Sequence, residues 1–295
     1  MKRQRKTWFK SVFGHERDER IEDCPMKKGR KSAGRKRGPL PVGLSDTQRI
    51  ALAKAKMNRV MDHFLYLLEL HANNKFVVYS SLLSQQIPVS YAANAFNIFQ
   101  KGMHQIEIVR LYALWDSADL QKENIPTVIE LIDTDAIIGK LAVEISDHWK
   151  KQPMWVLSSA STRERVSAAI LREVKAAEFQ FGEEQAAKAK VDLKRAIADA
   201  RAILSSPRLA AIANLRDKHL AHSLAETRRE RGGPVPTMKY GDETTLLEDT
   251  IPIVEHLYCW VNGTSFSVSD SQEIDDQNAE ALWTACKFTI ETLKT

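Results

Sequence analysis

One short segment, residues 214–223, gathers the side chains of this chain that are best suited to acid–base chemistry. Arg216 is followed by Asp217 and Lys218, and His219 and His222 come next, in a stretch that should otherwise be apolar on its inner face. Imidazole is the side chain whose ordinary pKa lies nearest to neutral pH. The residue types leave three interpretations open, which are a nuclease site, a binding surface and a merely polar helix.

The position of Arg216 on the predicted helix is the most informative feature of this segment. A helix that begins at Pro207 turns by about 100° per residue, which places Arg216 about 20° from Leu209. The apolar residues of that same face are Leu209, Ala213, Leu220 and Leu224. Because an unpaired buried charge is costly, Arg216 must find an acidic partner or face a groove.

The two histidines lie at different angles on the same helix. His222 is about 120° around the helix and about 9 Å along it from Arg216, and His219 is about 60° from each. Arg216 and His222 therefore cannot converge on one small ligand within a single straight helix. A site could form where two helices meet, including the same helix of a second chain related by a two-fold axis.

The rest of the body is predicted to be all-α. Apolar residues recur at spacings of three and four, with Ser45 or Asp46 and Ser90 as helix caps and Pro126 and Pro207 in first turns. The predicted helices cover residues 45–74, 90–116, 126–153 with a break at 133–135, 161–205, 207–224, 242–263 and 275–293. Residues 228–233 are predicted to form a charged turn and residues 264–271 a loop.

The charge of the chain is concentrated at its N-terminus. Residues 1–40 contain 14 Lys and Arg against five Asp and Glu, while the whole chain carries a net charge of +5. With few apolar residues to bury, residues 1–43 are predicted to be a disordered basic tail, and residues 44–295 the folded domain. Arg35, Lys36 and Arg37 are candidate RNA contacts in that tail. The alternative is a terminus that only solubilises the chain.

Several classes of protein are excluded by composition and motif. No run of about 18 apolar residues is present, so no membrane association is predicted, and the charged N-terminus does not look like a secretory signal. The three cysteines form no C-x-x-C pair, which argues against a disulfide framework and a zinc site and favours the cytoplasm. No Gly-rich phosphate loop, Ser-His-Asp pattern or H-E-x-x-H motif occurs, and no cofactor or metal is predicted.

Other polar residues are weaker candidates. Asp116, Asp119 and Glu123 could attract a metal ion, but acidic residues near the end of a helix are commonly exposed. Arg110 is predicted to form a structural ion pair with Asp116. His71, on the first predicted helix, is interpreted as packed or solvated.

The segment from Leu215 to Ser223 resembles the signature of the HEPN (higher eukaryotes and prokaryotes nucleotide-binding) superfamily, in which an arginine and a histidine lie a few residues apart with a polar residue after the arginine. The branch that it resembles most is that of the abortive-infection AbiU-like proteins. The further stretches that suggest this branch are residues 110–116, 125–127, 239–242 and 263–267.

The resemblance implies an HEPN-like helical bundle and a metal-independent ribonuclease that leaves a 2′,3′-cyclic phosphate. Arg216 would bind the scissile phosphate, Asp217 would orient the neighbouring groups, and His222 would transfer the proton, with His219 as the alternative. Lys218 would contact the RNA. The resemblance also implies a homodimer, a role in phage defence or a toxin–antitoxin system, and an antitoxin as a partner. The competing interpretation is a non-catalytic module that binds nucleic acid or protein.

Overall fold

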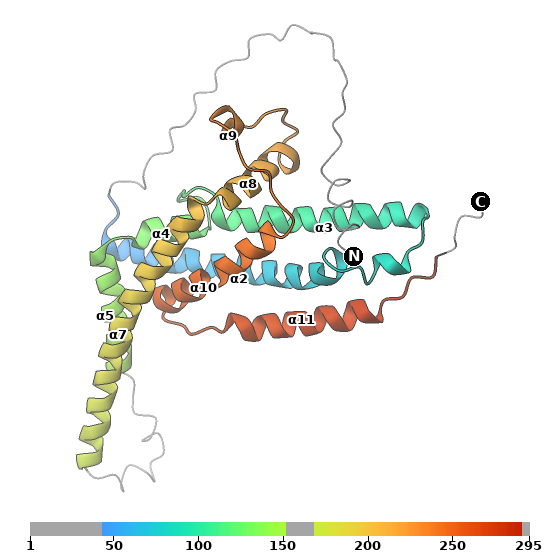
Figure 1. Cartoon of the computed structure of the whole chain (residues 1–295). Coiled ribbons are helices and arrows are strands. Elements are labelled where there is room, and N and C mark those ends of the chain that lie inside the picture. Colours follow the sequence, from blue (N-terminus) through green and yellow to red (C-terminus); the bar gives the residue numbers. More distant parts are fainter. Residues whose placement is uncertain (1–42, 152–167, 291–295) are drawn as a thin grey trace. The chain divides into compact units, whose positions relative to one another are not determined.

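The computed structural model describes residues 43–151 and 168–290, and every regular element in these ranges is a helix, so the all-α prediction is confirmed. The elements in chain order are α2 (Asp46–Val77), η1 (Ser84–Gln86), α3 (Tyr91–Trp115), α4 (Ile125–Ile132), α5 (Asp135–Lys151), α7 (Ala168–Leu204), α8 (Pro207–Leu215), η3 (Arg216–Leu220), α9 (Arg228–Arg231), α10 (Asp242–Asn262) and α11 (Val268–Ala285). Figure 1 shows their arrangement. The predicted basic tail, with Arg35, Lys36 and Arg37, lies outside the described residues, as does the predicted helix start at Ser161.

Helix α2 is the central element, and α3, α4, α10 and α11 all pack against it. Its start is set by a capping box in which the Ser45 hydroxyl accepts from the backbone of Gln48 and the Gln48 side chain accepts from the backbone of Ser45. The fully buried apolar residues on its inner stripe include Ala53, Met57, Val60, Phe64 and Leu67. This stripe has the spacing expected of a helix that is covered on one side.

Helices α3 and α10 cover α2 and support the candidate site. Ser90 caps α3 as predicted, and its side chain accepts a hydrogen bond from the backbone of Ala93. Near the other end of α3, the buried indole of Trp115 donates to the hydroxyl of Thr250 on α10 over 3.0 Å. Gly263 ends α10 with a φ of 70°, a left-handed conformation that favours glycine.

The last helix lies earlier in the chain than predicted. Helix α11 covers Val268–Ala285 instead of residues 275–293, so part of the predicted 264–271 loop is helical. Ser267 caps it, and the backbone of Val268 donates to Glu255 of α10. The Ser267 cap is a local signal that apolar spacing alone does not detect.

Helices α5 and α7 pack closely along each other, and both are visible as a pair in Figure 1. Asn124 caps α4, and the chain breaks at Asp133 and Thr134 before α5, as predicted. Gly182 of α7 permits the close approach, because a Cβ there would lie 3.0 Å from the Ser146 carbonyl oxygen and 3.4 Å from the Trp149 Cβ. No helix in the described part of the chain is both long and apolar enough to span a membrane.

Candidate functional site

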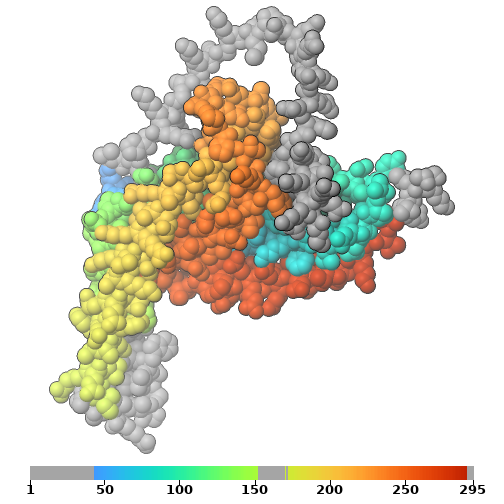
Figure 2. Space-filling view, in the orientation of Figure 1, coloured from blue at the N-terminus to red at the C-terminus, as the bar shows by residue number. Residues whose placement is uncertain are grey.

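The segment that carries Arg216 begins as a regular helix and then widens. Ser206 caps α8 through a hydrogen bond from the backbone of Leu209, and Pro207 occupies the first turn, as the sequence predicts. After Leu215 the backbone changes to the i→i+5 pattern of a π-helix, in which the Ala221 N–H donates to the Arg216 carbonyl over 2.8 Å. This turn, η3, lies at the surface with α9 in the orange region of Figure 2.

The prediction of one straight helix to Leu224 with Arg216 on its buried face is therefore wrong. A π-turn rotates each residue by less than an α-helix does, so the angles calculated at about 100° per residue fail beyond Leu215. The buried face of α8 keeps Leu209 and Ala213, but Leu220 is only half-buried and Leu224 is 41% exposed. Arg216 itself has a side chain that is 31% exposed.

Arg216 is held by an acid and an aromatic ring. Its Nη1 donates to Asp217 Oδ1 over 2.8 Å, and its guanidinium lies 5.0 Å from the centre of the Tyr112 ring on α3. A cation over the face of an aromatic ring is attracted by the ring quadrupole. The guanidinium is thus fixed in direction while its side chain stays partly exposed, and a phosphate-binding arginine needs both.

A second arginine, which the sequence pattern did not single out, shares this carboxylate. Arg229 Nε lies 3.9 Å from Asp217 Oδ2, and Arg229 Nη2 donates to the Tyr112 hydroxyl over 3.2 Å. Burial raises the pKa of Tyr112, as does the charge of Asp116, so the phenol stays protonated. Two guanidinium groups therefore flank Asp217 at the surface, and both carry donors suited to a phosphate.

Arg229 belongs to α9, a four-residue helix where a charged turn was predicted. Thr227 and Glu230 form a capping box at its start, and the Asn214 amide and the Lys218 amine also donate to Glu230. The hydrogen bond from Asn214, followed by those from the Thr227 backbone and Lys218, lowers the pKa of Glu230 to about 2. The threonine followed three residues later by a glutamate was the signal that could have predicted this helix.

Lys218, predicted to contact RNA, is engaged within the chain. Its Nζ forms an ion pair of 2.9 Å with Glu230 Oε1. This pairing joins η3 to α9, so Lys218 also positions Arg229 beside Asp217. The two roles are compatible, because its side chain remains 27% exposed.

His219 and His222 are both exposed, and neither forms a hydrogen bond or ion pair with Arg216 or Asp217. Burial, and then the positive charges of Lys218 and Lys101, lower the pKa of His219. The imidazole of His222 forms no hydrogen bond or ion pair with any residue that the structure describes.

The weaker candidates take structural roles. Asp116 pairs with Lys122 over 2.8 Å, and Arg110 lies 5.2 Å from the centre of the Tyr66 ring. The predicted ion pair between Arg110 and Asp116 is thus wrong, because the two side chains leave α3 toward different neighbours. Within residues 43–151 and 168–290, no group of three or more His, Cys, Asp or Glu side chains is placed to hold a metal ion.

A buried polar cluster behind the candidate site was also missed. Glu107 Oε1 lies 2.6 Å from His71 Nδ1, and its Oε2 accepts from the Asn74 amide and the Tyr79 hydroxyl. Burial alone would raise the pKa of Glu107, but the hydrogen bonds and the charge of His71 outweigh it and lower that pKa. His71 was predicted to be packed or solvated, and the structure packs it against this carboxylate.

A second histidine–carboxylate pair extends the cluster to α10. His104 Nε2 lies 3.1 Å from Glu243 Oε1, and both side chains are fully buried. The edge of the Tyr79 ring meets the His104 ring with 6.0 Å between centres. Together the two pairs join α2, α3 and α10 in the core that supports α8 and η3.

Comparison with known families identifies the chain. The AbiU2 model of HEPN proteins matches residues 54–282, which reach from the first part of α2 to most of α11 and include the whole of η3. The chain belongs to the HEPN AbiU2 family. The resemblance inferred from the segment around Arg216 is thereby confirmed, and the AbiU2 match extends well beyond that segment. Searches of the curated proteins and of the solved structures found no match.

Proposed function

We propose that this AbiU2-family chain cleaves RNA without a metal ion, using Arg216, Asp217 and His222 of two chains that meet at η3. The observation that carries the proposal is the contrast between Arg216, the first residue of η3, and His222, which lies two residues after η3. Arg216 is fixed by Asp217 and Tyr112 and stays partly exposed, while His222 is exposed and forms no hydrogen bond or ion pair with the described residues. Each chain therefore offers a phosphate-binding group and an acid–base group that do not meet each other.

The proposed reaction is transfer of the phosphate to the neighbouring 2′-oxygen. His222 removes the proton of the ribose 2′-hydroxyl, the 2′-oxygen attacks phosphorus, and the bond to the 5′-oxygen breaks. The leaving 5′-oxygen takes a proton from the His222 imidazolium that the first step formed. The product carries a 2′,3′-cyclic phosphate. Arg216, with Arg229 beside it, neutralises charge that develops on the phosphate oxygens. Asp217 holds both guanidinium groups in place.

An exposed apolar stripe on α3 supports the pairing of two chains. Its members share one side of the helix and are Tyr91, Ile98, Phe99, Ile106 and Val109, with exposed fractions from 38% to 78%. The stripe continues toward Tyr112, which Arg216 covers. Exposed apolar side chains that gather on one side of a helix favour a protein interface. Pairing along this stripe would bring the η3 turns of two chains toward each other.

Replacing Ile98 by lysine is expected to separate the proposed dimer. Ile98 is 71% exposed in the single chain, so a lysine there costs little in folding, whereas burial of its charge in an interface is unfavourable. We expect dimerisation to weaken by at least about tenfold, measured by analytical ultracentrifugation, with a parallel loss of cleavage. Val191→Lys, at a 66% exposed site on α7, is the matched control and should leave the dimer intact. A dimer unaffected by Ile98→Lys would contradict this interface.

The basic tail is proposed to be an electrostatic arm for RNA. Replacing Arg35, Lys36 and Arg37 by alanine is expected to weaken RNA binding and its salt dependence. The slope of log affinity against log salt should become shallower by about 0.7 for each RNA phosphate that the tail no longer neutralises. Fluorescence anisotropy with single-stranded RNA over a salt series measures this. An unchanged slope would contradict the RNA-binding role and favour residues 1–43 as a terminus that only solubilises the chain.

The experiment that tests the proposed function is RNA cleavage in excess EDTA. We expect cleavage to continue and its products to carry 2′,3′-cyclic phosphate ends, which mass spectrometry identifies. RNA that is bound but not cut would favour the non-catalytic binding module instead. The AbiU2 family supports a role in abortive infection, and we place the chain in phage defence or a toxin–antitoxin system, with a protein antitoxin as its partner.

A further inference from the structure

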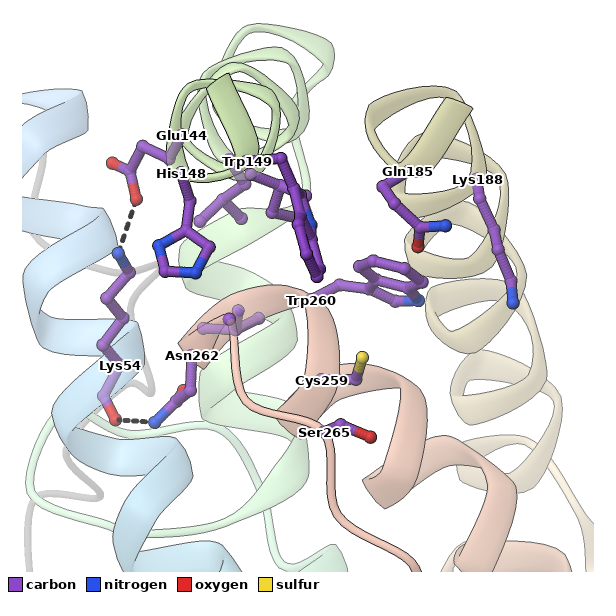
Figure 3. A pocket seen from close by; sticks show the side chains of 14 residues that line it. Lys54, Glu144, His148, Trp149, Gln185, Lys188, Cys259, Trp260, Asn262 and Ser265 are labelled. Carbon is purple, nitrogen blue, oxygen red and sulfur yellow. Dashed lines mark hydrogen bonds and ion pairs between the residues drawn. The ribbon is translucent and has the colours of Figure 1, made fainter. Parts of the chain in front are cut away.

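A pocket of about 500 Å³ lies where α5, α7 and the end of α10 meet, apart from the residues of α8, η3 and α9. Its volume is within the range of pockets that bind small molecules. Figure 3 shows that side chains from four elements surround it, with Lys54 and Glu144 on one side and Gln185 and Lys188 on the other. No step of the proposed cleavage uses these residues.

Two tryptophans provide the aromatic walls of the pocket. Trp260 is 7% exposed, and its indole N–H donates to Asp192 over 3.1 Å, which fixes the ring. Trp149 is 36% exposed, and its ring is supported edge-to-face by Phe181, with 4.8 Å between centres. Figure 3 shows both indoles at the same hollow. Rings held in this way offer a stacking surface to a flat aromatic molecule.

The two lysines that line the pocket differ in their ion pairing. Lys54 is neutralised by Glu144 at 2.5 Å, whereas Lys188 forms no ion pair with any other residue in the described ranges and lies 6.0 Å from the centre of the Trp260 ring. One cation is therefore left to attract an anionic group at the edge of the aromatic walls. Burial raises the pKa of the Cys259 thiol, which keeps this lining residue a neutral thiol and argues against a covalent role.

We propose that this pocket binds a small planar aromatic molecule that carries an anionic group. Its ring stacks on the more exposed Trp149, with Trp260 as the adjoining wall, and its anionic group pairs with Lys188. The site is separate from η3, so this binding does not depend on the proposed cleavage.

Isothermal titration of the full chain tests the proposal, with the four nucleoside 5′-monophosphates as aromatic anions, the four corresponding nucleosides as the aromatic part alone and inorganic phosphate as the anion alone. We expect at least one monophosphate to bind saturably at submillimolar to millimolar concentration. The matching nucleoside and inorganic phosphate should each bind about tenfold more weakly. Trp149→Ala should also weaken the monophosphate by about tenfold, through loss of stacking.

Lys188→Ala tests the contact with the anionic group by itself, independently of any loss of packing between α5 and α7 in Trp149→Ala. It removes an exposed side chain and should weaken binding of the monophosphate about tenfold while leaving binding of the matching nucleoside unchanged. Lys175→Ala, at another exposed lysine of α7 that does not line the pocket, and Arg216→Ala should both bind as the unaltered chain does. Absence of saturable binding by all four monophosphates would overturn the proposal, as would binding that survives Lys188→Ala.

Discussion

RNA cleavage by the His222→Ala variant is expected to be about 10²–10⁴-fold slower than by the unaltered chain, because general acid–base catalysis contributes a factor of that size. His222 is exposed on the turn after Arg216, and it touches no described residue through hydrogen bonds or ion pairs. Its replacement therefore removes a proton-transfer group without disturbing the fold. Single-turnover cleavage of a labelled RNA in EDTA measures the rate, and thermal unfolding of the variant checks the fold.

His219→Ala is the matched control for this prediction. His219 is likewise exposed but lies on η3, three residues before His222, and we expect its replacement to change the rate by less than about tenfold. Arg216→Ala should lower the rate about as strongly as His222→Ala, because a group that stabilises phosphate charge contributes about 10²–10³-fold. A large loss in His219→Ala with full activity in His222→Ala would exchange the roles of the two histidines. Full activity in all three variants would exclude this segment as the site.

The largest expected loss of stability follows from replacing Glu107 by alanine. Its carboxylate is bonded to His71, Asn74 and Tyr79 in the core between α2 and α3. Alanine leaves three polar groups without their acceptor, which costs about 3–5 kcal/mol of the free energy of unfolding. Urea denaturation measures this change. Glu173→Ala, at an exposed site of α7, is the control and should change stability by less than about 0.5 kcal/mol.

The lowered pKa of Glu107 predicts that the folded chain loses stability in acid. The pKa of Glu107 is lower in the folded chain than its ordinary value of 4.5, through its hydrogen bonds and the charge of His71. Its contribution to stability is therefore complete above pH 4.5 and is lost as the pH falls through the lowered folded pKa. Glu107→Gln should remove this part of the pH dependence. An unfolding free energy that rises on acidification over this range would contradict the assignment.

Helix boundaries set by local chemistry could be predicted from the sequence. Ser45, Ser90 and Ser206 accept hydrogen bonds from backbone groups three residues away, and Gly263 ends α10 with its own left-handed backbone. Such signals depend on neighbours in the chain. The apolar spacing likewise predicted the inner stripe of α2 correctly.

The geometry of the candidate site depends on distant contacts and could not be predicted in the same way. The π-turn at Arg216 packs on Tyr112, more than 100 residues earlier in the chain, and α9 brings Arg229 to Asp217 through bonds to Asn214 and Lys218. Residue types identified the segment, but uniform helical angles placed Arg216 on a buried face that does not exist beyond Leu215.

The most direct test of a site shared by two chains is to mix two inactive variants. Arg216→Ala and His222→Ala are each expected to be inactive alone. In a mixed dimer, His222 of the first variant and Arg216 of the second complete one of the two sites. Random pairing should therefore restore about a quarter of the normal cleavage rate. A mixture that remains as inactive as its components, although mixed dimers form, would contradict the shared site.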